Sequence, residues 1–207
     1  YVEGENVAID FEFPVQVAQL PAHAAQLVER RVDVIFAAPF LETGSSLLVS
    51  SSTDANVYLA GGTVAVTAEV KGDLSVVGGS LIVDAPVQGD TLLVGGSLKL
   101  AAPTRGDARL VGGSITISEP IQGDLVAIGG TIVDSGSNAS NVFIAGGEVT
   151  LTGGAEGPVS IYGNSVVLGG TFVKDVEVTA GNRVTLLPGT RIEGELRYQA
   201  PQEASIP

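Results

Sequence analysis

Aspartates that recur at a fixed interval are the residues of this sequence with the clearest chemical potential. Each follows a glycine, and the spacing between successive members is constant: Asp73, Asp90, Asp107 and Asp124. Carboxylate oxygens are ligands that Ca²⁺ prefers, so a stack of these side chains could hold calcium. A carboxylate after glycine also accepts hydrogen bonds from turn amides, and we favour this structural role. The Gly-Gly-x-Gly-x-Asp nonapeptide of calcium-binding β-rolls is absent, and we expect no metal and no cofactor.

Catalytic residues have few candidates in this composition. The chain contains no Cys and a single His, His23. Disulfides, zinc–thiolate sites and thiol nucleophiles are therefore excluded, and one His makes no metal-binding cluster. None of the glycine-rich segments carries the Gly-Lys-Ser/Thr ending of a phosphate-binding loop. We expect a protein that is not an enzyme.

The segment 134–140 combines turn-forming residues with a modification motif. Its sequence is Asp-Ser-Gly-Ser-Asn-Ala-Ser, and these residue types favour turns. We predict a local outward bulge here, because an unpaired carboxylate at Asp134 would be costly to bury. Asn138 begins an Asn-x-Ser triplet, so it is a candidate N-glycosylation site within the predicted bulge.

A strict internal repeat positions the aspartates. Glycine pairs recur at the same interval, and they begin at Gly61, Gly78, Gly95, Gly112, Gly129 and Gly146. A period of about 17 residues is too short for a helix-turn-helix unit and suits one coil of a β-solenoid. Apolar residues alternate within each repeat, as they do in strands. The sequence predicts an all-β protein, a parallel β-helix of about eight rungs over residues 41–198, with an irregular tail over 199–207.

Equivalent positions of successive repeats form columns on the predicted coils. We expect Leu59, Leu110 and their equivalents to point inward, and the glycine pairs to mark corners where positive φ angles favour glycine. One outward column is apolar: Ala60, Val77, Val94, Val111, Ile128 and Ala145. A continuous exposed apolar stripe usually marks an interface. Either residues 1–40 of the same molecule or another subunit would cover it.

Residues 1–40 lie outside the repeat and form a predicted N-terminal arm. Residues 6–18 alternate as a strand, 21–31 suit a short helix, and 32–36 alternate again. The apolar side chains of the first strand share one face: Val7, Ile9, Phe11, Phe13, Val15 and Val17. We predict that this face is an interface that joins subunits, covered either by a rod end or by the stripe of Val77, Val94, Val111 and Ile128 of a neighbour.

The charge balance restricts the partners. The chain has 23 acidic and 10 basic residues, a formal net charge of −13. No basic patch is available, so we expect no binding to nucleic acid and none to anionic membrane surfaces. No run of 18 apolar residues occurs, so we expect no membrane insertion in this segment. The absence of Cys and the scarcity of Lys favour an extracellular or cell-surface protein.

Two stretches of the repeat resemble bactofilin-type polymer-forming proteins. They are Val-Lys-Gly-Asp-Leu-Ser-Val-Val-Gly-Gly-Ser-Leu at 70–81 and Ile-Gln-Gly-Asp-Leu-Val-Ala-Ile-Gly-Gly-Thr-Ile at 121–132. The tail at 187–198 is similar to tails of surface-associated members of that group. The resemblance spans about residues 55–198 and implies a right-handed parallel β-helix that polymerises end to end without nucleotide. The long N-terminal arm and the few lysines depart from the family and favour a cell-surface filament or layer.

These observations predict a non-enzymatic structural subunit that assembles with copies of itself through end-to-end and arm contacts. A bactofilin-type cytoskeletal scaffold in the cytoplasm is one alternative, and a monomeric surface-anchored module that binds a ligand is another. A hexapeptide-repeat acyltransferase is the enzymatic alternative, because its coil has about 18 residues. Such enzymes resemble this chain in the repeat alone and use a His base, whereas His23 lies outside the coils.

Overall fold

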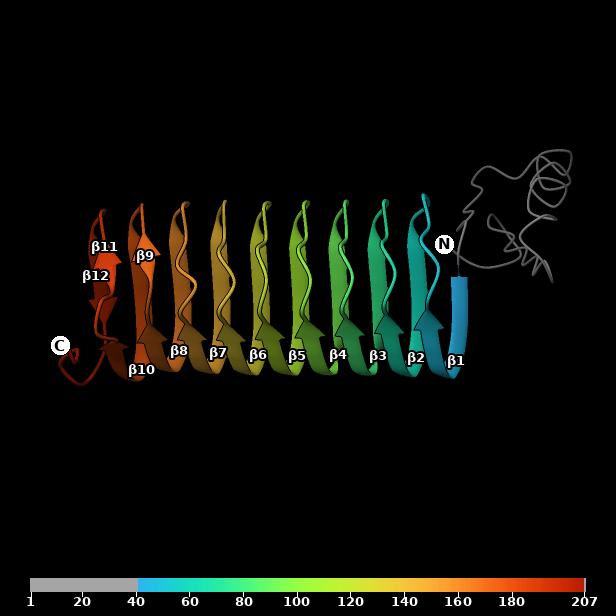
Figure 1. The fold of residues 1–207 in the computed structure, drawn as a ribbon. Coiled ribbons are helices and arrows are strands. Elements are labelled where there is room, and N and C mark those ends of the chain that lie inside the picture. The colour runs from blue at the N-terminus through green and yellow to red at the C-terminus, as the bar shows by residue number, and fades with distance from the viewer. Residues whose placement is uncertain (1–40, 207) are drawn as a thin grey trace, which may run out of the picture. The chain divides into compact units, whose positions relative to one another are not determined.

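The computed structural model describes residues 41–206, and this part of the chain is a β-solenoid of strands and turns without a helix (Figure 1). Ten strands form one parallel sheet in the order in which they occur along the chain. They are β1 (Leu41–Val49), β2 (Val57–Val66), β3 (Leu74–Val83), β4 (Thr91–Leu100), β5 (Ala108–Ile117), β6 (Leu125–Asp134), β7 (Val142–Leu151), β8 (Val159–Leu168), β10 (Val176–Leu186) and β12 (Leu196–Gln199). The predicted fold class is confirmed, with more strands in the stack than the eight rungs expected.

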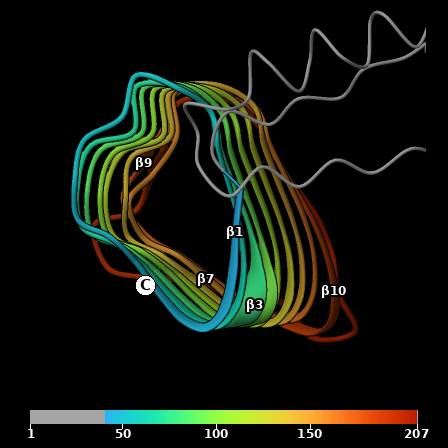
Figure 2. The same ribbon diagram turned by 90° about the vertical axis from the view of Figure 1, so that its right-hand side faces the viewer.

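The strands stack in the register that the repeat predicts. Val57 of β2 lies beside Leu74 of β3, and Leu74 lies beside Thr91 of β4. Viewed along the stack, the coils superimpose (Figure 2). Isolated parallel bridges, from Thr53–Val70 to Ala155–Phe172, join the remaining side of successive coils. A short second sheet pairs β9 (Thr171–Phe172) with β11 (Arg191–Ile192).

The core consists of aliphatic columns inside the coils. In each strand from β2 to β8 the first, third, eighth and tenth residues are buried. The alternation changes phase between the third and eighth residues, where the glycine pair lies. A strand that keeps its hydrogen bonds while its inward face changes phase must bend there, so the predicted corners are confirmed.

The glycines of these corners serve a different purpose from the one predicted. Among the described residues, positive φ angles occur at Gly154, Gly170 and Gly189, and none of these belongs to a corner pair. A Cβ at Gly112 would lie 2.9 Å from the carbonyl oxygen of Gly95 on the preceding rung. Glycine is therefore needed at the corner because the backbones of successive rungs approach each other too closely for a side chain.

The two ends of the described chain differ. β1 pairs along almost its whole length with β2, whereas β12 pairs with β10 at four positions. The predicted irregular tail is partly ordered, because Ser205 bridges to Thr185 and exchanges backbone hydrogen bonds with Val184 and Leu186 at 3.0 and 2.9 Å. The predicted N-terminal arm, with its two strands, its helix and His23, lies outside the described residues.

The predicted bulge at 134–140 is wrong. Asp134 is the last residue of β6 and lies in register between Ile117 and Leu151, and Asn138 bridges to Ile121 and Ala155. Both side chains are buried, with exposed fractions of 0% and 1%. The coil keeps its path because a bulge would break the hydrogen bonds to the rungs on both sides.

Candidate interaction surface

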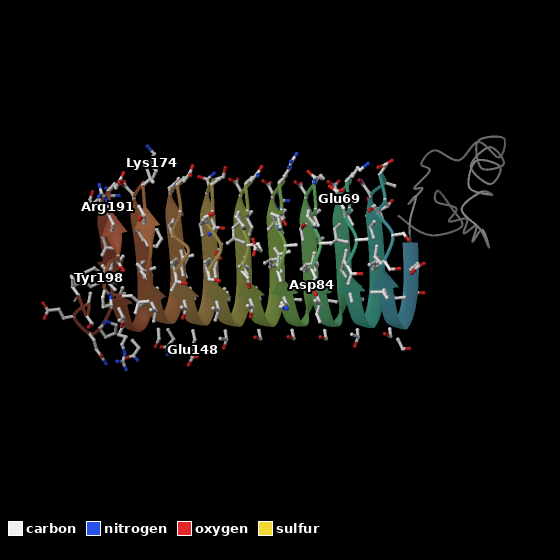
Figure 3. The ribbon with its side chains drawn as sticks, in the orientation of Figure 1. Glu69, Asp84, Glu148, Lys174, Arg191 and Tyr198 are labelled. Atoms are coloured by element: carbon white, nitrogen blue, oxygen red, sulfur yellow. The ribbon has the colours of Figure 1, made fainter. Side chains whose placement is uncertain are left out.

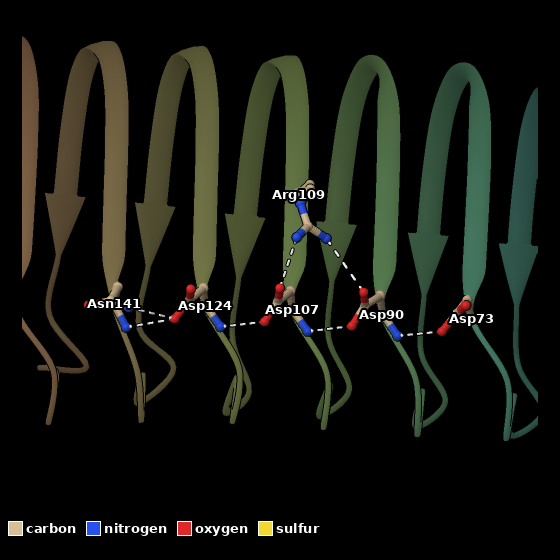
Figure 4. A network of polar contacts seen from close by, with 6 residues as sticks. All are labelled: Asp73, Asp90, Asp107, Arg109, Asp124 and Asn141. Carbon is tan, nitrogen blue, oxygen red and sulfur yellow. Dashed lines mark hydrogen bonds and ion pairs between the residues drawn. The ribbon is translucent and has the colours of Figure 1, made fainter.

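The repeated aspartates form a ladder along one edge of the stack. The backbone N–H of Asp90 donates to Oδ1 of Asp73, that of Asp107 to Oδ1 of Asp90, and that of Asp124 to Oδ1 of Asp107 (Figure 4). Each of these donor–acceptor distances is 2.9 Å. Asn56 begins the ladder and Asn141 ends it with equivalent bonds. The predicted role as acceptors of turn amides is confirmed, and each amide belongs to the next rung.

This geometry explains why glycine precedes each aspartate. A Cβ at Gly123 would lie 2.5 Å from both Oδ1 of Asp107 and the carbonyl oxygen of Gly106. A side chain there would displace the carboxylate from the amide that it accepts. The Gly-Asp pair is thus one structural device, which joins each coil to the next.

The expectation that the ladder holds no calcium stays a prediction. One oxygen of each carboxylate accepts a backbone hydrogen bond, which leaves the second oxygen for other partners. Within residues 41–206, no three acidic or histidine side chains come together as a group that could hold a metal ion. The second oxygens of Asp90 and Asp107 both face Arg109, at 3.6 and 2.8 Å.

The core contains one polar pair, which the sequence did not predict to be buried. Asp134 accepts hydrogen bonds from Nδ2 of Asn138 at 2.8 Å and from the backbone N–H of Gly136 at 3.0 Å. Burial raises the pKa of Asp134 to about 6, although both hydrogen bonds oppose this shift. Oδ1 of Asn138 has no hydrogen-bond partner in the structure.

The burial of Asn138 contradicts the surface position that glycosylation requires. Its side chain is 1% exposed, and its amide nitrogen, the atom that would carry the glycan, donates to Asp134. Attachment of a sugar to this nitrogen would force it out of the core and break the bond to Asp134. The folded coil therefore does not present Asn138 as an acceptor for a glycan.

The outward side of the first half of each strand is apolar. The predicted column lies there: Val77, Val111 and Ile128 are 55%, 43% and 45% exposed, and Val94 is half-buried. A second outward column, which the sequence analysis did not identify, lies beside it. We define the apolar face as both columns from β3 to β8, namely Ser75, Leu92, Arg109, Val126, Phe143 and Ser160 with Val77, Val94, Val111, Ile128, Ala145 and Tyr162.

The second column could have been found from the alternation alone. Leu92 lies between the inward residues Thr91 and Leu93, so it must point outward. It escaped notice because polar residues interrupt this column at Ser75 and Arg109. The rings of Phe143 and Tyr162 lie 5.8 Å apart across two rungs and join the two columns.

Charged side chains border the apolar face. The aspartate ladder runs along the edge where each strand begins, and Arg109, the one charged residue of the face, extends toward that ladder (Figure 4). Glu148 projects from the corner that follows the glycine pair, and Glu69 and Lys174 project from the opposite end of the coils (Figure 3). An apolar centre with a charged rim is the usual composition of a protein interface.

Two hollows on the described surface are small. One of about 150 Å³ lies between Glu177 and Tyr198, and one of about 220 Å³ lies beside Asn138 and Thr171. Both fall below the volume of about 300 Å³ at which small-molecule sites begin. Among residues 41–206, no helix is long and apolar enough to cross a membrane.

Comparisons of the chain with protein-family models, with curated proteins and with solved structures found no match. The function is therefore inferred from the described residues alone. The structure places Val77, Val94, Val111 and Ile128 together on the apolar face. The other predicted interface residues, Val7, Ile9, Phe11, Phe13, Val15 and Val17, lie outside the described residues.

Proposed function

We propose that this protein is a non-enzymatic structural subunit that assembles with copies of itself into a filament or layer at the cell surface. The observation that carries the proposal is the open stack, because β1 and β12 are the two outer strands of the sheet within the described residues. A terminal strand presents backbone N–H and C=O groups along one side, and another coil can pair with them.

The β1 end offers the longer edge. β1 has nine residues, most of its described side chains are exposed, and β12 has four residues. We propose that this edge receives the neighbouring subunit, and we keep the expectation from the sequence that the strand at 6–18 links subunits. Two unlike ends favour head-to-tail contacts, which do not close into a ring and therefore produce open filaments.

A monomeric module that binds a small ligand has less support. A module that encloses its ligand needs a pocket, and the two hollows beside Tyr198 and Asn138 are too small for a drug-sized molecule. The regular surface of the stack suits an extended macromolecular contact instead.

Electron microscopy of the purified full-length chain tests the proposal. A single stack of ten strands is about 43 Å long at about 4.8 Å per step, so we expect rods that are several times longer. Deletion of residues 1–20 should leave short, folded rods that are monodisperse in light scattering and that keep the strand signal of the solenoid in circular dichroism. Full-length protein that stays a single short rod at high concentration would overturn the proposal. Equal filaments from both chains would exclude the arm as the linking element.

A further inference from the structure

We propose that two copies of the chain pair laterally through their apolar faces, with the solenoid axes parallel and pointing the same way. The inference rests on the proposed function, to which it adds a side-by-side contact between filaments. Its first basis is charge. The apolar face contains no acidic residue, although the chain has 23 acids and a net charge of −13.

Self-association through any acidic surface would bring like charges together, which is unfavourable. The apolar face avoids this repulsion. Its single charge, on Arg109, is neutralised within the same molecule by Asp107 and Asp90. The face ends at β10, where Glu177 follows Ser160 in register. A second copy is therefore a suitable occupant, because both partners then bury apolar surface without an unpaired charge.

The size of the face fits a lateral contact of filaments. The strands from β3 to β8 together span about 29 Å of the stack, and the distance from the aspartate ladder to the glycine pairs is about 16 Å along each strand. Two such faces bury about 900 Å² together, near the lower limit of about 1,000 Å² for specific interfaces. A contact of this size holds one pair of subunits only weakly. Two filaments that lie side by side make this contact once per pair of subunits, so the total contact between them increases with filament length.

The aspartate ladder decides the orientation. Two faces can meet around a two-fold axis that runs along the solenoids, or around one that runs along the strands. The second arrangement places the ladder of one copy against the ladder of the other. The first separates the ladders by the width of the face, about 16 Å, which exceeds the Debye length of about 8 Å at physiological salt. Parallel solenoids therefore avoid the repulsion.

Side-chain sizes agree with this arrangement. Around an axis along the solenoids, each residue of one outward column meets the other column of the same rung in the partner. Phe143 then faces Ala145 of the second copy, and Tyr162 faces Ser160. A large side chain thus meets a small one, as close packing of two sheet faces requires.

Single cysteines test the pairing, because the chain has none of its own. The variants are V77C, V111C and I128C on the apolar face, with V133C as the control, an exposed valine of β6 outside that face. The full-length variants are treated with a short bismaleimide. Parallel pairing brings the introduced cysteine near the same cysteine of the partner, whichever rung carries it. We expect all three to form covalent dimers about tenfold faster than V133C. Rates equal to the control would overturn the pairing, and fast reactions at V111C and I128C with a slow reaction at V77C would overturn the parallel orientation.

Electron microscopy separates this inference from the proposed function. Val111→Glu adds an acid to the centre of the face, and Val133→Glu adds the same charge elsewhere. We expect two subunits across the filament in wild type and in V133E, and one in V111E, which keeps its length. Wild-type filaments one subunit wide would overturn the pairing and leave the proposed function intact. Cross-linked pairs without any filaments would refute the proposed function and support the pairing.

Discussion

Neutralising Asp134 should stabilise the protein at neutral pH. Its carboxylate lies in the core, where desolvation raises the pKa from 3.8 to about 6. Because the folded state holds this proton more tightly than the unfolded state, the contribution of Asp134 to stability is greatest below pH 4. It falls between pH 4 and 6 and stays low above pH 6. About two pKa units at 1.36 kcal/mol each correspond to about 3 kcal/mol.

The test is Asp134→Asn, with urea unfolding measured at several pH values between 3.5 and 8. The amide oxygen of the new side chain can still accept from Gly136. If the Asn138 amide turns over, so that its Oδ1 takes the place of Nδ2, this oxygen, which lacks a partner in wild type, accepts from the new amide nitrogen. We expect the variant to gain about 2–3 kcal/mol over wild type at pH 7.5, and little at pH 3.5.

Asp73→Asn is the matched control, because it makes the same chemical change on the exposed ladder and keeps the Oδ1 acceptor. It should alter stability by less than about 0.5 kcal/mol. If the difference in the free energy of unfolding between D134N and wild type does not depend on pH, the carboxylate of Asp134 is not desolvated. Lower stability of D134N at pH 7.5 would refute the reasoning outright.

Three further predictions concern the stack itself. Leu110→Asp places a second carboxylate in the core, without the partners of Asp134, and should lower the free energy of unfolding by about 3–5 kcal/mol. A urea transition equal to that of wild type would contradict the inward orientation of this column. Gly123→Ala should destabilise more than Gly163→Ala, because a Cβ at Gly123 would lie 2.5 Å from backbone and carboxylate oxygens, whereas one at Gly163 would lie 3.0 Å from the Val166 methyl group and 3.3 Å from the nearest carbonyl oxygen. Equal urea midpoints would argue against the close approach of rungs. Millimolar Ca²⁺ should leave the melting temperature unchanged if the ladder only accepts amides, whereas a rise of many degrees would indicate specific binding.

The regular features of the fold were predictable from the sequence. A strict period assigns every position of one coil to the same environment in the next. The inward columns, the corners and the hydrogen-bonding role of Asp90 and Asp107 follow from that period and from alternation. The exposed column of Val77 and Ile128 follows in the same way, since it lies one residue from a buried column.

The prediction that proved wrong concerns residues whose type favours turns and solvent but whose position in the period is inward. Asp134 and Asn138 favour turns and solvent, so the sequence predicted a bulge. The structure buries both, because their backbone pairs with the rungs on either side and cannot leave the stack without losing those bonds. The carboxylate then finds its donors locally, at Gly136 and Asn138.

The sequence by itself determined the length of the coil and the environment of each position within it, because a period can be read directly along the chain. The tertiary structure decided what occurs between coils. The glycine of each corner is required by the carbonyl oxygen of the preceding rung, one full repeat away, and not by its own φ angle. The breadth of the apolar face also emerges only when strands lie side by side, since Phe143 and Tyr162 belong to different columns until two rungs bring their rings together. Contacts that join distant residues at close range depend on stacking distances, which no local pattern encodes.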